Sequence, residues 1–284
     1  MKTIRIGSRE SKLAVIQSKI VIDLIQRHFP EYETELVTMK TTGDIRQDIS
    51  LDKIGGRGLF VKELDRALLN GEVDVTVHSL KDMPLETNAE LPVIAYTRRS
   101  SPFDALILPQ SGETDFSRVG CSSNRRAQRF KELYPNANII PIRGNVPTRL
   151  EKLDKGEYTA IILACAGLER LGLTNRISRV FTPNEIVPAA GQGIIAVQCR
   201  KGFEFLKKIT DTEAEICAKA ELSAIRALGG GCSVPAGVYA AVEGERLHIY
   251  GYHFKDGKSV RKELYGDINA PEALGIKLAE ELKL

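Results

Sequence analysis

The stretch that decides the fold is Ile194-Ile-Ala-Val-Gln-Cys199, an apolar, strand-like run that follows the turn-rich segment 183–193. Alternating strand and helix patterns lie on both sides of the polar run 98–102, which predicts two α/β domains. If 194–199 rejoins the first sheet, the chain crosses between the domains twice, and paired crossings form a hinge. The stretch therefore predicts one discontinuous domain with a second domain inserted into it.

The remainder of the chain changes character. Three β-rich runs between residues 238 and 265 are separated by Glu-Gly-Glu and Asp-Gly turns, and a final helix is expected at 271–282. This pattern is typical of a small α+β domain with an antiparallel three-stranded sheet. We expect the following boundaries: domain 1, residues 1–97 and 194–213; domain 2, residues 98–193; domain 3, residues 214–284.

The first helix is expected at 10–29, directly after a strand at 3–7. Its apolar stripe is predicted from the helical spacing of the larger side chains. These are Leu13, Ile16, Ile20 and Leu24, with His28 continuing the row.

Composition excludes several classes of protein. The net charge of +3, the 6% of aromatic residues and the absence of tryptophan disfavour a nucleic-acid-binding protein. Charges interrupt every run that approaches the roughly 18 apolar residues of a membrane span, and no secretory signal is visible. Five cysteines without Cys-x-x-Cys spacing indicate free thiols in a reducing compartment and no metal site. We therefore expect a cytoplasmic protein that is not in a membrane.

Arginines recur where a predicted strand meets a helix or loop. Guanidinium groups form bidentate bonds with carboxylates or phosphates and stay charged near neutral pH, so this arrangement predicts a site for a polyanionic ligand. Serines accompany some of them, and Ser8 or Ser11 could equally be a plain helix N-cap. The arginines are Arg9, Arg125, Arg126, Arg143, Arg149 and Arg170.

Lys81 and Asp82 follow the β-branched strand 73–78 directly, and ligands of open α/β sheets bind just beyond the carboxyl ends of strands. An aspartate among many cations suits a substrate that develops positive charge, and it could also handle a proton. Alternatively, the two residues form a turn that Pro84 stiffens.

Two glycine-rich loops complete the set of candidates. Gly55-Gly-Arg-Gly58 is either a mobile loop or a linker. Leu228-Gly-Gly-Gly-Cys-Ser-Val-Pro-Ala-Gly237 can present the Cys232 thiol at a fixed place, because glycines free the backbone and Pro235 stiffens it. Cys232 could also be a small buried residue beside a turn.

Four motifs together resemble those of the porphobilinogen deaminase family, in the family's order and over nearly the full chain. They are Ser79-Leu-Lys-Asp-Met-Pro84, Ser122-Ser-Asn-Arg-Arg126, Arg143-Gly-Asn-Val-Pro-Thr-Arg149 and Gly229-Gly-Gly-Cys-Ser-Val-Pro235.

The resemblance implies two α/β domains like type II periplasmic-binding-protein lobes, joined by a hinge, and a third domain that carries the cysteine. It implies a dipyrromethane cofactor attached through a thioether to Cys232 and serving as a primer. The family condenses four porphobilinogen units onto the primer with loss of ammonia and hydrolyses the product to hydroxymethylbilane. Asp82 matches the catalytic aspartate, which meets pyrrole N–H groups and the azafulvene-like cation.

The resemblance also assigns roles to the candidate side chains. Asp82 and five others are implied in cofactor binding: Lys81, Ser123, Arg125, Arg126 and Arg143. Four are implied in substrate binding: Arg9, Ser11, Arg149 and Arg170. Asp44, Arg57 and Phe60 match the active-site loop, and Gln192 matches the hinge. The sequence departs from the family at Asn124, where a hydrophobic residue is common, and at Arg57, which keeps the charge of the usual lysine with another donor geometry.

The resemblance implies a monomer that passes hydroxymethylbilane to uroporphyrinogen-III synthase. A rival interpretation is a non-enzymatic, two-lobed binding protein for a small anionic ligand. The thiol in a third domain argues against that rival.

Overall fold

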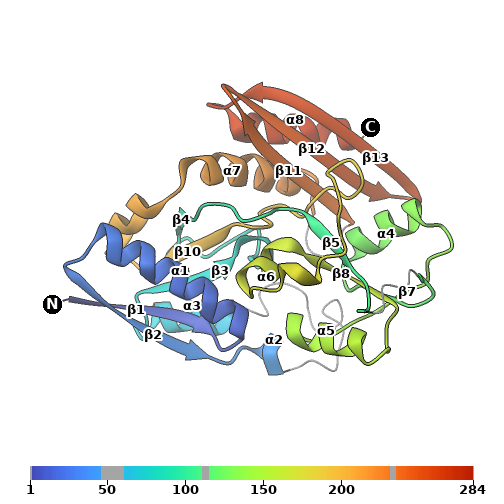
Figure 1. The fold of residues 1–284 in the computed structure, drawn as a ribbon. Helices are drawn as coiled ribbons and strands as arrows, with labels where there is room; N and C mark the ends of the chain where they lie inside the picture. Colours follow the sequence, from blue (N-terminus) through green and yellow to red (C-terminus); the bar gives the residue numbers. More distant parts are fainter. Residues whose placement is uncertain (1, 46–60, 111–114, 231–234, 284) are drawn as a thin grey trace. The chain divides into compact units, whose positions relative to one another are not determined.

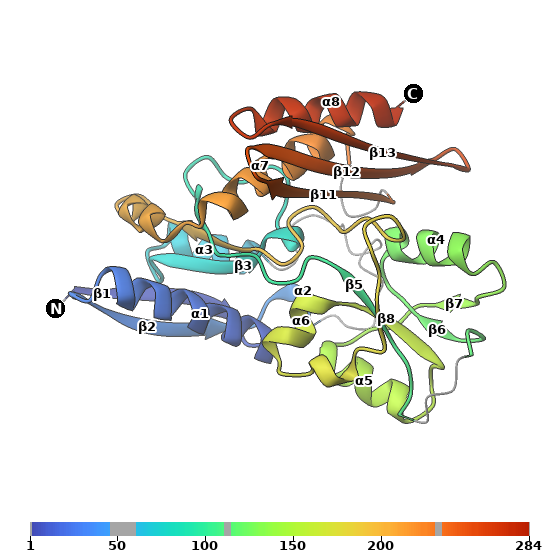
Figure 2. The same cartoon turned by 45° about the horizontal axis from the view of Figure 1, so that its top comes forward.

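The structure, a computed structural model, describes residues 2–45, 61–110, 115–230 and 235–283 (Figures 1 and 2). The chain divides into two compact units. Unit 1 comprises Met1–Arg99 and Ile194–Ile216, and unit 2 comprises Ser100–Gly193 and Cys217–Leu284. The division into three domains predicted above stays a prediction.

Unit 1 contains a five-stranded sheet with strand order β2-β1-β3-β10-β4. The strands are β1 (Lys2–Arg9), β2 (Tyr32–Met39), β3 (Val75–Ser79), β4 (Val93–Tyr96) and β10 (Ile195–Cys199). β1 runs parallel to β2 and β3, whereas β10 runs antiparallel to β3 and β4. The predicted return of 194–199 to the first sheet is confirmed, and β10 occupies an interior position there.

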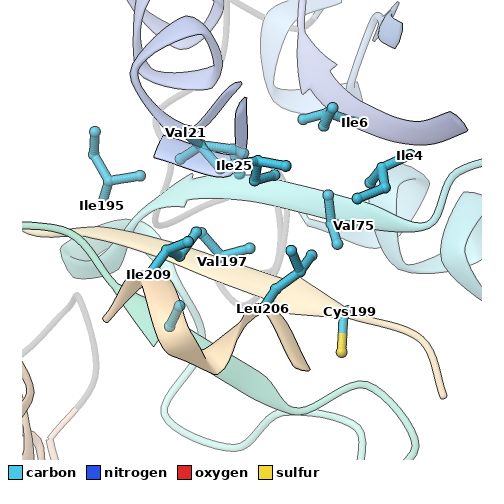
Figure 3. Packing of buried hydrophobic residues seen from close by; sticks show 12 residues of the cluster. Ile4, Ile6, Val21, Ile25, Val75, Ile195, Val197, Cys199, Leu206 and Ile209 are labelled. Atoms are coloured by element: carbon cyan, nitrogen blue, oxygen red, sulfur yellow. The ribbon is translucent and has the colours of Figure 1, made fainter. Parts of the chain in front are cut away.

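Every residue of β10 is buried, which explains its apolar sequence. Ile195, Val197 and Cys199 point into the main core of unit 1, together with side chains from helix α1 (Lys12–His28) and the 3₁₀ helix Glu204–Ile209. Figure 3 shows this core. Its buried members are Ile4, Ile6, Val21, Ile25, Val75, Val77, Ala95, Ile195, Val197, Cys199, Leu206 and Ile209.

The apolar stripe expected on the first helix is wrong by about one position. The predicted residues Leu13, Ile16, Ile20 and Leu24 are only half-buried, and His28 is exposed. Small and polar side chains share the buried face because the helix lies close to the sheet, and the longer side chains cover the edges of the contact. The buried residues are Ala14, Gln17, Ser18, Val21 and Ile25.

The remaining described helices of unit 1 are short. α2 spans Thr42–Ile45, α3 spans Lys62–Leu69, and a 3₁₀ helix spans Leu80–Asp82. α3 buries Leu64, Ala67 and Leu68. A longer helix, α7 (Thr212–Ala227), begins in unit 1 and ends in unit 2.

The first sheet of unit 2 repeats the strand arrangement of unit 1, with strand order β7-β6-β8-β5-β9, although its fourth strand, β5, comes first in the chain of that unit and β10 comes last in its own sheet. β6 runs parallel to β7 and β8, and β5 runs antiparallel to β8 and β9. Its strands are β5 (Asp104–Ile107), β6 (Val119–Gly120), β7 (Ile139–Ile140), β8 (Ala160–Ala164) and β9 (Arg179–Val180). Its helices are α4 (Asn124–Leu133), α5 (Val146–Asp154), α6 (Cys165–Arg170) and a 3₁₀ turn, Thr174–Arg176. β9 was not predicted, because two exposed edge residues carry no apolar period.

Unit 2 also contains an antiparallel sheet of β11 (Ala236–Glu243), β12 (Arg246–Lys255) and β13 (Lys258–Asp267). Helix α8 (Pro271–Lys283) packs directly on its backbone, since a Cβ added at Gly251 would lie 2.6 Å from Leu282. The predicted α/β class with an additional three-stranded antiparallel sheet is confirmed. Within the described ranges, no helix has the length and apolar character needed to cross a membrane.

A buried carboxylate fastens the returning strand of unit 1. Asp74, which is 2% exposed and precedes β3, accepts hydrogen bonds from the Arg5 backbone N–H at 2.8 Å and from Arg5 Nη2 at 2.9 Å. Arg200, directly after β10, donates to the same carboxylate through Nη2 at 2.6 Å. β1, β3 and the end of β10 are therefore joined by one shared acceptor.

Replacing Asp74 with Asn should lower the free energy of unfolding at pH 7 by about 2 kcal/mol, since two guanidiniums lose a shared anion. The loss stays near this value because the Arg5 and Arg200 side chains are 35% and 36% exposed and solvent screens them. Denaturant unfolding measures the change. An exposed control, Asp23→Asn, should change stability by less than about 0.5 kcal/mol.

The difference in stability between the wild type and Asp74→Asn should depend on pH. Burial raises the pKa of Asp74, but the hydrogen bonds from Arg5 and Arg200 outweigh burial and hold the pKa below its usual value. The stabilisation is therefore complete above the unfolded pKa of about 3.9 and is lost as the pH falls through the folded pKa. The wild type and Asp74→Asn should converge in that acidic range; equal stability at pH 7 would contradict the role of Asp74.

Candidate functional site

A pocket in unit 1 lies at the ends of β1 and β3, beside the first turns of α1. We call it the Asp82 pocket. Its lining residues are Arg9, Ala14, Gln17, Val61, Val77, His78, Ser79 and Asp82. The predicted placement of Arg9 and Asp82 at the carboxyl ends of strands thus brings both side chains to one place.

Local structure explains why Asp82 faces outward. β3 ends at Ser79, and residues 80–82 form one 3₁₀ turn in which the Met83 N–H donates to Leu80 O at 3.1 Å. Leu80 and Met83 are buried, at 3% and 8% exposure, so they anchor the turn. Asp82 between them is exposed, and its carboxylate has no hydrogen-bond partner in the part of the chain that the structure describes.

His78 gives the pocket a neutral wall. Two causes lower the pKa of His78 to about 4: burial, which is the larger, and the charge of Arg9. The imidazole Nε2 lies 2.8 Å from Thr76 Oγ1, within a buried polar group that includes Gln198. At neutral pH, His78 therefore adds no positive charge beside Asp82.

Sequence reasoning missed Gln17, a polar residue that lines the pocket. Gln17, on the buried face of α1, donates through Nε2 to Ser79 Oγ at 2.8 Å. Ser11 was predicted to bind substrate, and its hydroxyl accepts from the Ala14 N–H at 3.3 Å as the N-cap of α1. The available signal for Gln17 was its position: it is a polar residue on the face of the first helix that packs against the sheet.

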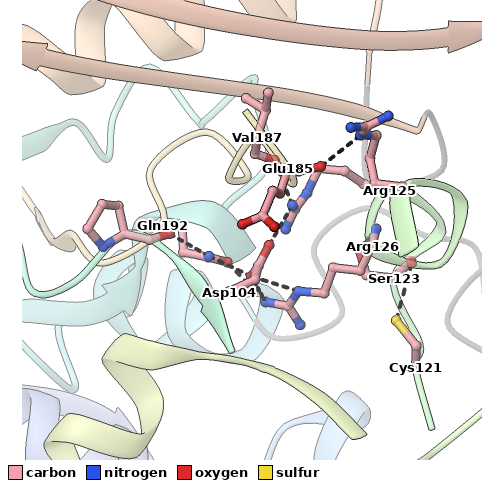
Figure 4. A network of polar contacts seen from close by, with 10 residues as sticks. Asp104, Cys121, Ser123, Arg125, Arg126, Glu185, Val187 and Gln192 are labelled. Carbon is pink, nitrogen blue, oxygen red and sulfur yellow. Dashed lines mark hydrogen bonds and ion pairs between the residues drawn. The ribbon is translucent and has the colours of Figure 1, made fainter. Parts of the chain in front are cut away.

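Unit 2 holds a second polar group, which we call the Asp104 cluster: Asp104, Arg125, Arg126 and Gln192. Figure 4 shows Asp104 between the other three side chains. Asp104 is fully buried and accepts from Arg125 Nη1 at 2.7 Å, Arg126 Nε at 2.8 Å and Gln192 Nε2 at 2.8 Å. Sequence reasoning found the two arginines and the glutamine but not the aspartate that joins them.

The cluster depends on the start of helix α4. Ser123 is its N-cap and accepts from the Arg126 N–H at 3.5 Å, which places Arg125 and Arg126 in the first turn. Burial would raise the pKa of Asp104, but the charges of Arg125 and Arg126 outweigh burial and hold the pKa well below its usual range. Asp104 is therefore a permanent anion at physiological pH.

A further arginine pair lies at the start of α5, with Arg143 before the helix and Arg149 within it. Asn145 caps the helix by accepting from the Thr148 N–H at 3.0 Å, and Arg149 Nε donates to Gly144 O at 2.8 Å. Gly144 has a φ of +114°, and a Cβ there would lie 2.8 Å from Thr148, so the turn requires glycine. Arg143 Nε is buried and has no hydrogen-bond partner among the residues that the structure describes.

Arg170 is a similar case on α6. Its Nη2 donates to Gly193 O at 2.6 Å, but its buried Nε has no hydrogen-bond partner within the described ranges. Burial lowers the pKa of Arg170 to about 10, which leaves the guanidinium charged at neutral pH. A buried, charged N–H without an acceptor is costly, so a ligand oxygen would satisfy it.

Some predicted residues cannot be placed. Cys232, Arg57 and Phe60 lie outside the described residues, and Asp44 is described only as part of α2. Lys81 is half-buried in the 3₁₀ turn before Asp82 and has an interaction partner.

The cysteines that the structure describes are poor nucleophiles. Cys121, Cys165, Cys199 and Cys217 are all buried. Burial raises the pKa of Cys165 and of Cys199 to about 11, so neither forms a thiolate readily near neutral pH. Within the described ranges, no group of three or more His, Cys, Asp or Glu side chains could hold a metal ion.

Two family models match this chain. The model for the porphobilinogen deaminase, dipyromethane cofactor binding domain, matches residues 4–208. The model for the porphobilinogen deaminase C-terminal domain matches residues 215–284.

Curated relatives match over nearly their whole length. The porphobilinogen deaminase of Acetivibrio thermocellus is 55% identical over 284 residues, covering 98% of this chain and 97% of that protein. The porphobilinogen deaminase of Ruminiclostridium josui is 53% identical over 287 residues, covering 100% and 98%. That of Stenotrophomonas maltophilia is 42% identical over 292 residues, covering 99% and 96%.

Solved structures show a more distant likeness. The periplasmic aliphatic sulphonate binding protein SsuA from Escherichia coli is 12% identical with a TM-score of 0.43, covering 80% of this chain and 70% of that chain. The periplasmic VFT2 domain of BvgS from Bordetella pertussis is 14% identical with a TM-score of 0.43, covering 78% and 91%. The fold described above rests on its own sheet order and pairing.

The neutral state of His78 can be measured by following the imidazole resonances in an NMR titration. We expect a pKa near 4 in the wild type. In Arg9→Gln the pKa should rise but stay below about 6.5, because burial is the larger cause of its lowering. The control Arg27→Gln, at the far end of α1, should leave it unchanged.

The same titration has a consequence for stability. Between pH 6.5 and 4 only the unfolded chain takes up this proton, so His78 lowers stability as the pH falls through that window. A His78 that titrates near 6.5 in the wild type would contradict the described environment.

Proposed function

This chain belongs to the porphobilinogen deaminase family, and on that premise we propose how its residues share the family's reaction. The protein is a transferase of porphyrin and heme biosynthesis. It condenses four porphobilinogen molecules head to tail on a dipyrromethane primer, with loss of ammonia, and then releases hydroxymethylbilane by hydrolysis. The rival interpretation as a non-enzymatic binding protein is not favoured, because both enzyme-family models match and together cover most of the chain.

The observation that carries the assignment of the reaction centre is the exposed Asp82 carboxylate in a pocket with Arg9. Loss of ammonia from the substrate leaves a cation, and a fixed carboxylate stabilises that charge. Asp82 also has the reach to take or give a proton at the same place. Asp82 is therefore proposed as the catalytic residue.

The other residues of the Asp82 pocket favour this use. Arg9 supplies a guanidinium for an acid side chain of the substrate, which orients the pyrrole ring toward Asp82. His78 is neutral and does not repel a cation formed nearby. Ser11 and Lys81 stay proposals for substrate and cofactor binding, supported by their place at the N-cap of α1 and beside Asp82.

The unit 2 arginines fit a group that bears several carboxylates. In the described part of the chain, the buried Nε atoms of Arg143 and Arg170 have no hydrogen-bond partner, and each can donate to one ligand oxygen. Arg143 is proposed for cofactor acids, and Arg149 and Arg170 are proposed for substrate acids. This fit supports the dipyrromethane, which when bound supplies the primer to which the first porphobilinogen is joined.

We assign the attachment of the cofactor to Cys232 from its motif and by comparison with the other thiols. The four cysteines that the structure describes are buried, and burial raises the pKa of Cys121, Cys165 and Cys199. Ser123, Arg125 and Arg126 belong to the first turn of α4, where a helix N-terminus adds to the attraction for an acid group. These three are proposed to hold cofactor acids.

Loop and hinge roles stay proposals as well. Asp44, Arg57 and Phe60 are proposed as an active-site loop on the motif match alone. Gln192 is supported as a hinge residue by its contacts: its Nε2 donates to Pro102 O at 2.6 Å and joins the two segments at which the chain enters and leaves unit 2.

The cellular setting follows from the reaction. We propose a cytoplasmic monomer that passes its unstable product to uroporphyrinogen-III synthase. A monomer is supported by the large hydrophobic side chains that are exposed, which come from five different elements: Leu69, Val180, Phe205, Tyr265 and Ile276.

Intact-mass measurement tests the cofactor assignment. The purified protein should carry an excess mass equal to one dipyrromethane, and Cys232→Ser should have the unmodified mass because the sulfur that forms the thioether is gone. Cys217→Ser, at a buried thiol, is the matched control and should keep the excess. An unmodified wild type that also fails to consume porphobilinogen would overturn the proposal.

Turnover of Asp82→Asn tests the reaction centre. Ammonia release should fall by about 10²–10⁴-fold, because the amide neither stabilises a cation nor exchanges a proton. The thermal midpoint and the excess mass should stay as in the wild type, because Asp82 holds no hydrogen bond within the described residues. Glu86→Gln, another exposed carboxylate in the following loop, should turn over normally. Near-normal turnover of Asp82→Asn would refute its catalytic role.

A further inference from the structure

Asp104 is a fully buried carboxylate that contacts Arg125 and Arg126, two residues proposed to bind the cofactor. It stands at the first position of β5 and has no exposed surface. Its Oδ1 accepts from Arg126 Nε and Gln192 Nε2, both at 2.8 Å, and its Oδ2 accepts from Arg125 Nη1 at 2.7 Å. Arg126 Nη2 also lies 2.7 Å from Oδ1. Both oxygens are thus used to orient the cluster.

Asp104 holds one side of each guanidinium, and a second acceptor helps to hold it there. Arg125 makes its two hydrogen bonds through Nη1, to Asp104 and to Val187 O at 2.7 Å. Arg126 turns Nε and Nη2 toward Asp104, and Nη2 also donates to Gln192 Oε1 at 3.1 Å. A guanidinium has five N–H donors, and both of these bonds of Arg125 use Nη1, so its Nε and Nη2 edge can still meet an acid group of a ligand.

The aliphatic part of the Arg125 side chain is also closely packed. A Cβ added at Gly237, in β11, would lie 2.5 Å from Val187 O and 3.0 Å from Arg125 Cδ. The backbone of β11 therefore lies against this side chain. Gly237 follows Cys232 by five residues, and covalent geometry alone keeps their Cα atoms within about 17 Å.

We propose that Asp104 is a positioning residue, which holds Arg125 and Arg126 in the orientation from which they bind an acid side chain of the cofactor attached at Cys232. This inference rests on the proposed function. Asp104 does not touch the cofactor; it acts through the two arginines. Gln192 holds the carboxylate in turn, which ties the orientation of the arginines to the segment at the chain crossing.

The chemistry of the carboxylate makes the role specific. Asparagine has nearly the same shape, but its NH₂ group would face an arginine donor, so one guanidinium would lose its fixed direction. Glutamate keeps the charge but moves it outward by one methylene within a closed site. Asp104→Asn and Asp104→Glu thus separate the charge from its position.

The test uses full-length protein made in a host that cannot synthesise porphobilinogen, so that it starts without the primer. Porphobilinogen is then added, and intact mass records how fast the dipyrromethane attaches. We expect attachment about tenfold slower in Asp104→Asn, since one charged hydrogen bond to the acid group is misdirected. Asp104→Glu should also attach the primer slowly, although it keeps a negative charge beside both arginines.

Two controls distinguish positioning from folding. Asp154→Asn removes a different Asp–Arg pair of unit 2, with Arg176, and should attach the primer at the wild-type rate. In an Arg125→Gln, Arg126→Gln background, adding Asp104→Asn should cause no further slowing, because the residues through which Asp104 acts are already gone.

A normal rate of primer attachment in both Asp104 variants would overturn this inference and leave the proposed function intact. An undiminished effect of Asp104→Asn in the double-glutamine background would overturn it as well, since Asp104 would then not act through the arginines. A wild type that stays unmodified with porphobilinogen would overturn the proposed function, and this inference with it.

Discussion

A carboxylate taken out of water must be paired, and both units of this protein are organised around one that is shared by two arginines. Asp74 joins Arg5 to Arg200, and Asp104 joins Arg125 to Arg126. In each unit the shared aspartate lies beside the strand that the chain enters or leaves by a crossing. Backbone hydrogen bonds between strands can form in several registers. A buried ionic contact between distant segments forms in only one of these registers, so it fixes the register.

The fold was largely predictable because its decisive strand is plain in the sequence. A run such as Ile194–Cys199 has no charge to place in water, so it belongs in the middle of a sheet, where β10 lies. The stripe of α1 was misjudged for a physical reason: close packing against a sheet selects small side chains such as Ala14 and Ser18 over the largest apolar ones. Edge strand β9 is too short and exposed to leave a pattern.

The candidate site was predictable where chemistry is local and not where it depends on contacts. Arg9 and Asp82 meet in one pocket because both follow strands of the same sheet, which strand order alone suggests. The partner of Arg125 and Arg126 lies some twenty residues earlier in the chain, and no motif links it to them. A charged residue at the head of an apolar run, as in Asp104-Ala-Leu-Ile107, is the one signal that was available.

The interior position of β10 has a consequence for the order in which the protein can fold during its synthesis. β3 and β4 are both complete once residue 96 has left the ribosome, yet they do not pair with each other; β10 separates them. Roughly a hundred residues must follow, which takes on the order of 5–20 s at about 5–20 residues per second. Until then β3 exposes an open, apolar edge of the kind that invites pairing with other chains. The first sheet is therefore completed only after residues 100–193 of unit 2 have been translated, while residues 217–284 are still to come.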